Sequence, residues 1–99
     1  MKIVYDMWGY SMTIVDFYAV IKETPKSLTV VPMTSKETPQ GYLSGTSVPD
    51  APVTDGPTSR LLKRKGYYVG TLNKANGNKL VRHIVFDWDG TPKDFNHCD

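Results

Sequence analysis

The pattern of β-branched and aromatic residues predicts a β-hairpin over residues 13–33. Its two apolar strands, residues 13–21 and 27–31, flank a turn that contains Pro25, whose fixed φ suits a turn. A helix over residues 11–21 is the alternative, because several apolar residues there also recur at helical spacing. The β-branched content and the adjoining strand favour the hairpin.

A second hairpin is predicted over residues 67–86, where two apolar stretches flank Asn76-Gly77, a strong signal for a tight hairpin turn. Residues 1–8 and 59–64 predict further strands. No segment has a convincing helical pattern. The chain is therefore predicted to be mainly β, with five to six antiparallel strands.

Residues 34–58 break this pattern, since they contain four prolines and three glycines. They predict a long Pro/Gly loop with at most a short strand at Tyr42-Leu43-Ser44, and a loop of this length is commonly a binding loop or a mobile flap. Pro32 is expected to end strand pairing or to lie at a sheet edge. Strands in so short a chain can avoid exposed edges by curling, so we predict a small, SH3-like barrel that carries this loop.

Length and composition predict one soluble domain over residues 1–99. Hydrophobic residues make up 39% of the chain and charged residues 22%, which is typical of a globular domain and not of a disordered one. No apolar run approaches the roughly 20 residues of a membrane-spanning helix. The only cysteine is Cys98, so no internal disulfide can form, which fits a reducing, cytoplasmic setting.

The net charge of +2 conceals an uneven distribution. Residues 57–86 contain seven basic residues and no acid, whereas residues 1–56 and 87–99 each carry more acids than bases. A basic segment between acidic flanks predicts either a polyanion-binding surface or a solvated strand face whose charges pair with the flanks.

One short motif resembles a catalytic signature. An apolar strand followed by Asp87-x-Asp89-Gly-Thr is similar to the first motif of haloacid-dehalogenase-like phosphatases, where the first Asp is the nucleophile and the second a general acid/base. That motif opens a large parallel α/β domain, but only residues 92–99 follow it here, and each parallel crossover needs about a dozen residues or more. We therefore expect a strand end and a turn at these two residues, and no catalytic role.

Other chemistry is not favoured, and we expect no metal, no cofactor and no enzymatic activity. The aspartates near the C-terminus do not supply the six or more oxygen ligands of a calcium loop. His83 with His97-Cys98 matches no structural zinc spacing. The glycines stand singly, unlike those of a phosphate-binding loop.

The basic segment holds the best candidates for binding. Tyr67-Tyr68 follow a basic run, and because adjacent strand residues face opposite sides, one of the two rings should be exposed beside it. Such a ring can stack on nucleic-acid bases or act as a protein-binding hot spot; alternatively, it packs beneath lysine stems. The candidate binding residues are Arg60, Lys63, Arg64, Lys65, Tyr67, Tyr68, Lys79 and Arg82.

Two longer motifs indicate origin. Trp-Gly-Tyr-x-x-Thr-x-x-Asp-Phe-Tyr, from Trp8 to Tyr18, and Trp-Asp-Gly-x-Pro, from Trp88 to Pro92, resemble the opening and close of a group of small uncharacterised phage and mobile-element proteins. The chain departs from that pattern at Ser11-Met12, where the group has Asp-Gln, and at Ile14, where it has Asn. Any role of those polar residues in the group is therefore in doubt for this chain.

The resemblance implies a protein of phage type, and small proteins of this kind are often binders that modify host machinery or block host defences. The first hypothesis is a non-enzymatic binding protein that occludes a host protein, for example an anti-CRISPR-like inhibitor of a defence nuclease. The second is a small β-barrel that binds nucleic acid through the basic residues and one tyrosine. The third is capture of an anionic nucleotide signal by the same basic residues.

Overall fold

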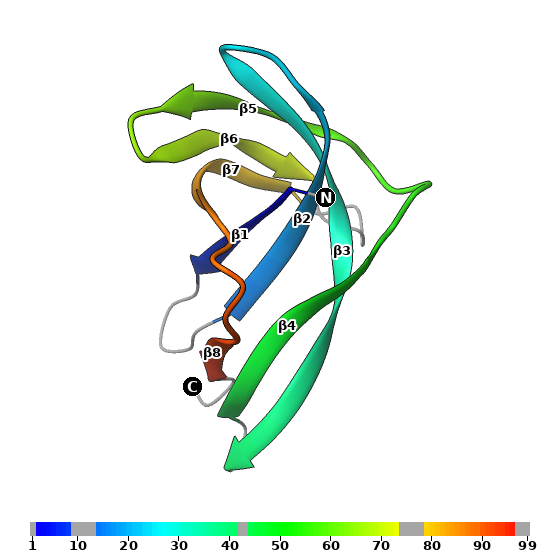
Figure 1. Cartoon of the computed structure of the whole chain (residues 1–99), viewed down its shortest axis with the longest axis vertical. Coiled ribbons are helices and arrows are strands. Elements are labelled where there is room, and N and C mark those ends of the chain that lie inside the picture. Colours follow the sequence, from blue (N-terminus) through cyan, green and yellow to red (C-terminus); the bar gives the residue numbers. More distant parts are fainter. Residues whose placement is uncertain (1, 9–13, 42–43, 74–78, 97–99) are drawn as a thin grey trace.

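The computed structural model describes residues 2–8, 14–41, 44–73 and 79–96, and for residues 8, 79–82 and 96 it describes the backbone alone. These residues form eight antiparallel strands and no helix (Figure 1). The strands are β1 (Ile3–Trp8), β2 (Ile14–Glu23), β3 (Ser27–Gly41), β4 (Ser44–Pro52), β5 (Ser59–Arg64), β6 (Tyr67–Asn73), β7 (Lys79–Asp87) and β8 (Lys93–Asn96).

Six of the strands close into a barrel, which confirms the predicted small antiparallel β-barrel. The sheet order is β2-β1-β7-β6-β5-β3-β4-β8, and an additional pairing between β2 and β3 joins the first strand to the sixth. Strands β4 and β8 extend the sheet beyond the barrel. Figure 1 shows β3 and β4 running on past the barrel strands, with β8 beside β4. Closure removes edges from the six barrel strands, as the short chain requires.

Both predicted hairpins are confirmed, and the alternative helix over residues 11–21 is wrong. Strands β2 and β3 pair from Tyr18↔Pro32 to Glu23↔Leu28, and β6 pairs with β7. The β-branched residues of β2 prefer the extended backbone, where their side chains pack on both sides of the sheet. The Asn76-Gly77 turn lies outside the described residues.

The predicted long loop over residues 34–58 is wrong for most of its length. Residues 34–41 continue β3, which is 15 residues long, and residues 44–52 form β4. The prolines are tolerated because the β3–β4 register shifts twice, between Met33 and Ser35 and between Pro39 and Gly41. Among the described residues of this range, 53–58 are the ones that remain as a connection. Of the short strand expected at Tyr42-Leu43-Ser44, the first two residues lie outside the described part of the chain.

As expected, Pro32 ends the pairing of β3 with β2, because Tyr18↔Pro32 is the last pair of that ladder, although Pro32 is buried and β3 itself continues to Gly41. The Pro32 carbonyl accepts a hydrogen bond from the Val53 amide at 2.9 Å on the other side of the strand. On that side β3 pairs with β5 as far as Val30 and with β4 from Met33 onwards. Proline therefore occupies the junction between two partner strands, where a missing N–H breaks no ladder bond.

Two apolar clusters stabilise the fold. The first fills the barrel and is fully or almost fully buried; it consists of Val4, Tyr18, Leu28, Val30, Leu61, Tyr68, Leu72 and Val85. The second lies outside the barrel, where β8 covers the outer side of β2, and is formed by Val15, Phe17 and Phe95 packed against Ile3, Tyr5, Met33 and Trp88. Because strand residues alternate between the two sides, β1 and β2 contribute to both clusters.

An ion-pair network closes one end of the barrel. The Glu23 carboxylate accepts hydrogen bonds from the Lys63 ammonium at 2.6 Å and from the Lys2 ammonium at 3.3 Å. The Tyr68 hydroxyl donates to Asp87 at 2.8 Å, and Lys2 lies 5.4 Å from the centre of the Tyr68 ring. The network thus links β2, β5, β6 and β7 to the segment that enters β1.

This network predicts a loss of stability in acid. Lys63 and then Lys2 lower the pKa of Glu23 below its ordinary value of 4.5, so charged Glu23 stabilises the fold above that pH and the stabilisation is lost as the pH falls through the lowered pKa. We expect Glu23→Gln to be less stable than wild type at pH 7, with the difference shrinking below about pH 4.5. Urea unfolding from pH 7 to pH 3 measures this, with Glu37→Gln as the control. A constant difference at every pH would contradict it.

Candidate functional site

Three neighbouring barrel strands present a surface that β4 and β8 do not cover. Residues Leu61, Tyr68, Leu72 and Val85 point into the barrel, so their neighbours along β5, β6 and β7 point outwards. We call this surface the outer face. It is formed by Arg60, Leu62, Arg64, Tyr67, Val69, Thr71, Ile84 and Phe86.

An apolar row crosses the outer face. Leu62 of β5 pairs with Val69 of β6, and Val69 pairs with Ile84 of β7. Leu62 is 41% exposed and Ile84 is 50% exposed, although both are large aliphatic side chains. A contiguous apolar surface of this kind on a small soluble fold marks an interaction site more often than a single exposed residue does.

Aromatic residues border the apolar row. Tyr67 pairs with Arg64 and is 36% exposed, and Phe86 of β7 is 43% exposed. The Phe86 ring lies 6.1 Å from the Tyr5 ring, which in turn lies 6.4 Å from Phe17 in the second apolar cluster. The exposed ring is thus held by a chain of aromatic contacts, so it is presented in a fixed position.

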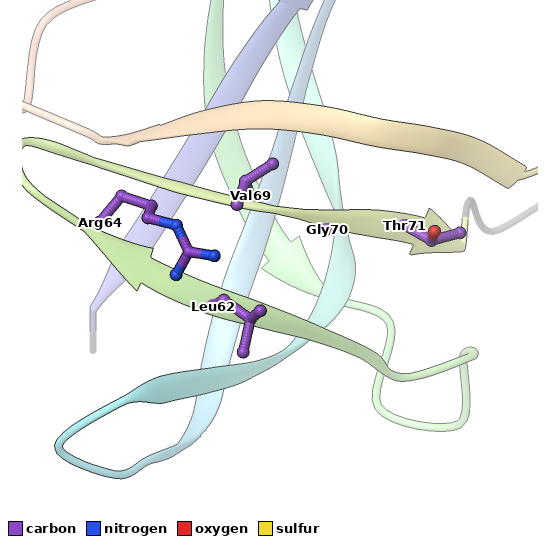
Figure 2. A pocket seen from close by; sticks show the side chains of 5 residues that line it. All are labelled: Leu62, Arg64, Val69, Gly70 and Thr71. Atoms are coloured by element: carbon purple, nitrogen blue, oxygen red, sulfur yellow. The ribbon is translucent and has the colours of Figure 1, made fainter.

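A shallow hollow lies between β5 and β6 on the outer face (Figure 2). It has a volume of about 190 Å³ and is lined by Leu62, Arg64, Val69, Gly70 and Thr71. Figure 2 shows the Arg64 guanidinium between the two strands, on the side of the hollow where Leu62 and Val69 lie. The lining combines aliphatic walls with a cation and a hydroxyl.

Gly70 is required by the close approach of β5 and β6 beneath this hollow. A Cβ at this position would lie 2.7 Å from the Arg60 carbonyl oxygen and 3.0 Å from Cδ2 of Leu61. The register of β6 and β7 also shifts next to it, between Gly70 and Leu72. Any other residue would push β5 and β6 apart, so the strand geometry explains the glycine.

The outer face is positively charged. Arg60, Arg64 and Lys65 are exposed, and residues 57–86 contain no acid. Arg64 donates from Nη1 to the Lys63 carbonyl at 3.1 Å, which positions its guanidinium beside the hollow. The remaining guanidinium donors can bind a carboxylate or phosphate with two parallel hydrogen bonds.

The structure brings only some of the predicted binding residues together. Arg60, Arg64, Lys65 and Tyr67 are exposed on or beside the outer face. As expected, one of the adjacent tyrosines is exposed and the other, Tyr68, is buried, and burial together with the hydrogen bond to Asp87 raises the pKa of Tyr68.

The other predicted residues are placed differently. Lys63 lies on the opposite side of β5, where its ammonium pairs with Glu23. Lys79 and Arg82 lie on β7, and their side chains are outside the described part of the structure.

Besides Thr71, four apolar residues of the outer face were not among the predicted binding residues: Leu62, Val69, Ile84 and Phe86. The sequence does contain a signal for them. Leu61-Leu62 and Ile84-Val85-Phe86 are apolar on both sides of a strand, and in a barrel without covering helices one side must face outwards. Apolar residues at consecutive positions therefore predict an exposed apolar surface once a barrel is assumed.

A contact between a buried carboxylate and an imidazole lies inside the barrel, away from the outer face. Asp6 of β1 is fully buried, and its Oδ2 lies 2.6 Å from Nδ1 of His83, whose side chain is 25% exposed. Asp16 of β2 pairs with Asp6 across the sheet, and burial, Asp6 and Asp16 together raise the pKa of Tyr18. This arrangement brings a carboxylate and an imidazole into the core, where both need partners.

The aspartates of the phosphatase-like motif are used in local structure. Asp87 ends β7 and accepts the Tyr68 hydrogen bond. Asp89 caps a turn by accepting hydrogen bonds from the Thr91 amide and hydroxyl at 3.1 and 2.7 Å, and Thr91 with Lys93 lowers its pKa. Gly90 completes the turn with a φ of 87°. These contacts fit the predicted strand end and turn.

Comparison with known proteins gave no match to any family model, curated protein or solved structure. Within the described residues, no helix is long and apolar enough to cross a membrane, and no group of three metal-binding side chains is present. His97-Cys98, considered above as metal ligands, lie outside these residues, as do Ser11-Met12 of the opening motif.

Proposed function

We propose that this protein is a non-enzymatic binding protein of phage type that occludes a host protein through its outer face. The observation that carries the proposal is the apolar row in which half-buried Val69 lies between exposed Leu62 and Ile84, bordered by Tyr67 and Arg64. Tyrosine and arginine are enriched among binding hot spots, and apolar residues form the desolvated centre of protein interfaces.

The rigidity of the surface supports recognition of a protein partner. The outer face is built on paired strands, and Phe86 is held by aromatic contacts to the second apolar cluster, so little conformational entropy is lost on binding. Inhibition of a host defence system is the specific form of this function that the resemblance to phage proteins suggests. A small rigid protein can block such a target by covering its functional surface.

The decisive experiment compares two isoleucine variants of the protein. We expect the wild type to capture a specific protein from host lysate and Ile84→Asp to lose it, because a charge in the apolar row cannot be desolvated cheaply. Ile21→Asp is the matched control, since Ile21 is 57% exposed on β2, away from the outer face. Mass spectrometry identifies the captured protein, and circular dichroism verifies that both variants fold. Equal capture by all three proteins would contradict the proposal.

Single-stranded nucleic acid is the second candidate partner. It is favoured by the exposed Tyr67 ring, which is paired with Arg64, and by the exposed Phe86 ring, since aromatic rings stack on bases and cations bind phosphates. Fluorescence anisotropy with labelled single-stranded DNA and RNA at two salt concentrations tests it. Binding that weakens steeply with salt and is lost in Tyr67→Ala would support it, and no binding at low salt would exclude it.

A further inference from the structure

We infer that the partner inserts one apolar side chain from an acidic segment into the hollow between β5 and β6, and places a neighbouring carboxylate on Arg64. This inference rests on the proposed function and specifies the chemistry of the partner. It is carried by three features of the outer face: the lining of the hollow, the position of the Arg64 guanidinium, and the charge around them.

The hollow fits a single side chain. Pockets that enclose whole small-molecule ligands measure roughly 300–1,000 Å³, whereas this hollow measures about 190 Å³. Leu62 and Val69 provide aliphatic walls, and the backbone at Gly70 and the Thr71 side chain complete the lining. An aliphatic or aromatic side chain placed there would remove these walls from water, which is the usual source of affinity at an interface centre.

The Arg64 guanidinium beside the hollow favours an acidic residue next to the partner's inserted apolar side chain. The Arg64 guanidinium lies next to Leu62 and Val69 (Figure 2). Arg60 is exposed two residues before Leu62, on the same side of β5. Among the described residues, neither arginine is paired with a carboxylate. An acidic residue next to the inserted side chain would supply the partner that the guanidinium lacks within this face.

The aliphatic character of the surface favours a protein segment over nucleic acid. Bases stack on flat rings, yet the hollow itself has aliphatic walls and the apolar row continues from Val69 to Ile84. A polypeptide that crosses the strands can fill the hollow and cover Ile84 with successive apolar side chains, while its acidic residues face Arg60 and Arg64. Nucleic acid provides phosphates for the arginines, but its bases are flat and carry no branched aliphatic side chain to fill the hollow.

Selection from a displayed library of random 12-residue peptides tests the inference. The full-length wild-type protein is the bait, and Arg64→Glu is the counter-selection bait. We expect the enriched peptides to share a Leu, Ile or Phe flanked by Asp or Glu. The best peptide, labelled with fluorescein, should bind Arg64→Glu at least about ten-fold more weakly, about 1.4 kcal/mol. Lys26→Glu carries the same charge change on an exposed turn residue and should stay within about two-fold of wild type.

Two further peptides separate the contributions of charge and shape. A version with Gln for each acidic residue and a version with Ser for each apolar residue should both lose at least about ten-fold in affinity. Replacing the acids by Lys should restore binding to Arg64→Glu, because the charges are then exchanged. A (dT)12 oligonucleotide is titrated in parallel.

Several results would overturn the inference. In the selection, these are no peptide enriched on wild type relative to Arg64→Glu, or enrichment of neutral or basic peptides. In the titrations, they are a Gln or Ser version that binds as tightly as the original peptide, or (dT)12 that binds more tightly than the peptide. If Ile84-dependent capture of a host protein persists while any of these occurs, the proposed function stands and the acidic, apolar segment is wrong. If that capture also fails, the outer face is not a protein-binding surface.

Discussion

Replacing His83 by Ala is expected to lower the free energy of unfolding by about 3 kcal/mol, because it removes the imidazole from a buried carboxylate. Asp6 is fully buried, and its Oδ2 lies 2.6 Å from Nδ1 of His83. Asp16 lies directly across the sheet from Asp6 and brings a second negative charge to this part of the structure. His83→Ala therefore removes a group that lies within ion-pair distance of a buried carboxylate.

The Asp6–His83 contact can be separated from simple loss of packing by a double-mutant cycle. Asp6→Asn in the His83→Ala background removes the buried carboxylate while keeping the shape of the side chain, so the double variant should regain part of the lost stability. Urea unfolding followed by circular dichroism at pH 7 gives all four free energies. Strictly additive effects of the two substitutions would show that the carboxylate and the imidazole do not stabilise each other.

The sequence predicted the barrel because its strand signals are local. The hairpins at residues 13–33 and 67–86 follow from β-branched residues and turn residues within a few positions of each other. The extension of β3 to Gly41 depends instead on a partner strand, β4, and on register shifts that accommodate Pro39. The number of prolines and glycines in residues 34–58 therefore predicted a loop, whereas pairing between β3 and β4 makes most of this segment a two-stranded sheet.

The candidate site could be predicted only in part, because it too depends on how the strands pair. Strand alternation requires that one of Tyr67 and Tyr68 is exposed, but it does not say which. The choice depends on the register of β5 and β6, which turns Tyr68 and Lys63 to the side of the barrel that carries Glu23 and Asp87. Charge alone grouped Lys63 with Arg64, whereas the fold places these two neighbours on opposite sides of β5.

The hollow could not have been predicted from composition, because it depends on a contact between backbones. Gly70 is an ordinary strand glycine in the sequence, and its role emerges only from the position of the Arg60 carbonyl and the Leu61 side chain. Gly70 lets β5 and β6 pack closely on the inner side of the sheet, whereas the hollow lies on the outer side. The glycine therefore sets the spacing of the two strands whose side chains, Leu62 and Val69, line the hollow.

Gly70→Ala should accordingly destabilise the barrel by about 2 kcal/mol, in the range of other overpacked cores. The added Cβ would stand 2.7 Å from the Arg60 carbonyl oxygen, and a backbone atom of a paired strand can retreat only if β5 and β6 separate. Thermal unfolding followed by circular dichroism measures the loss.

Gly66→Ala is the informative comparison for this prediction. Gly66 has a φ of 88° and no atom within 4 Å of an added Cβ, so its substitution costs about 1 kcal/mol from the left-handed backbone alone. Steric overlap at Gly70 predicts the larger loss of stability together with weaker partner binding, since Leu62 and Val69 would move apart. Backbone strain at Gly66, in the turn beyond the hollow, predicts the smaller loss with binding retained. The reverse order would show that β5 and β6 can separate at little cost, and that the hollow does not depend on their close approach.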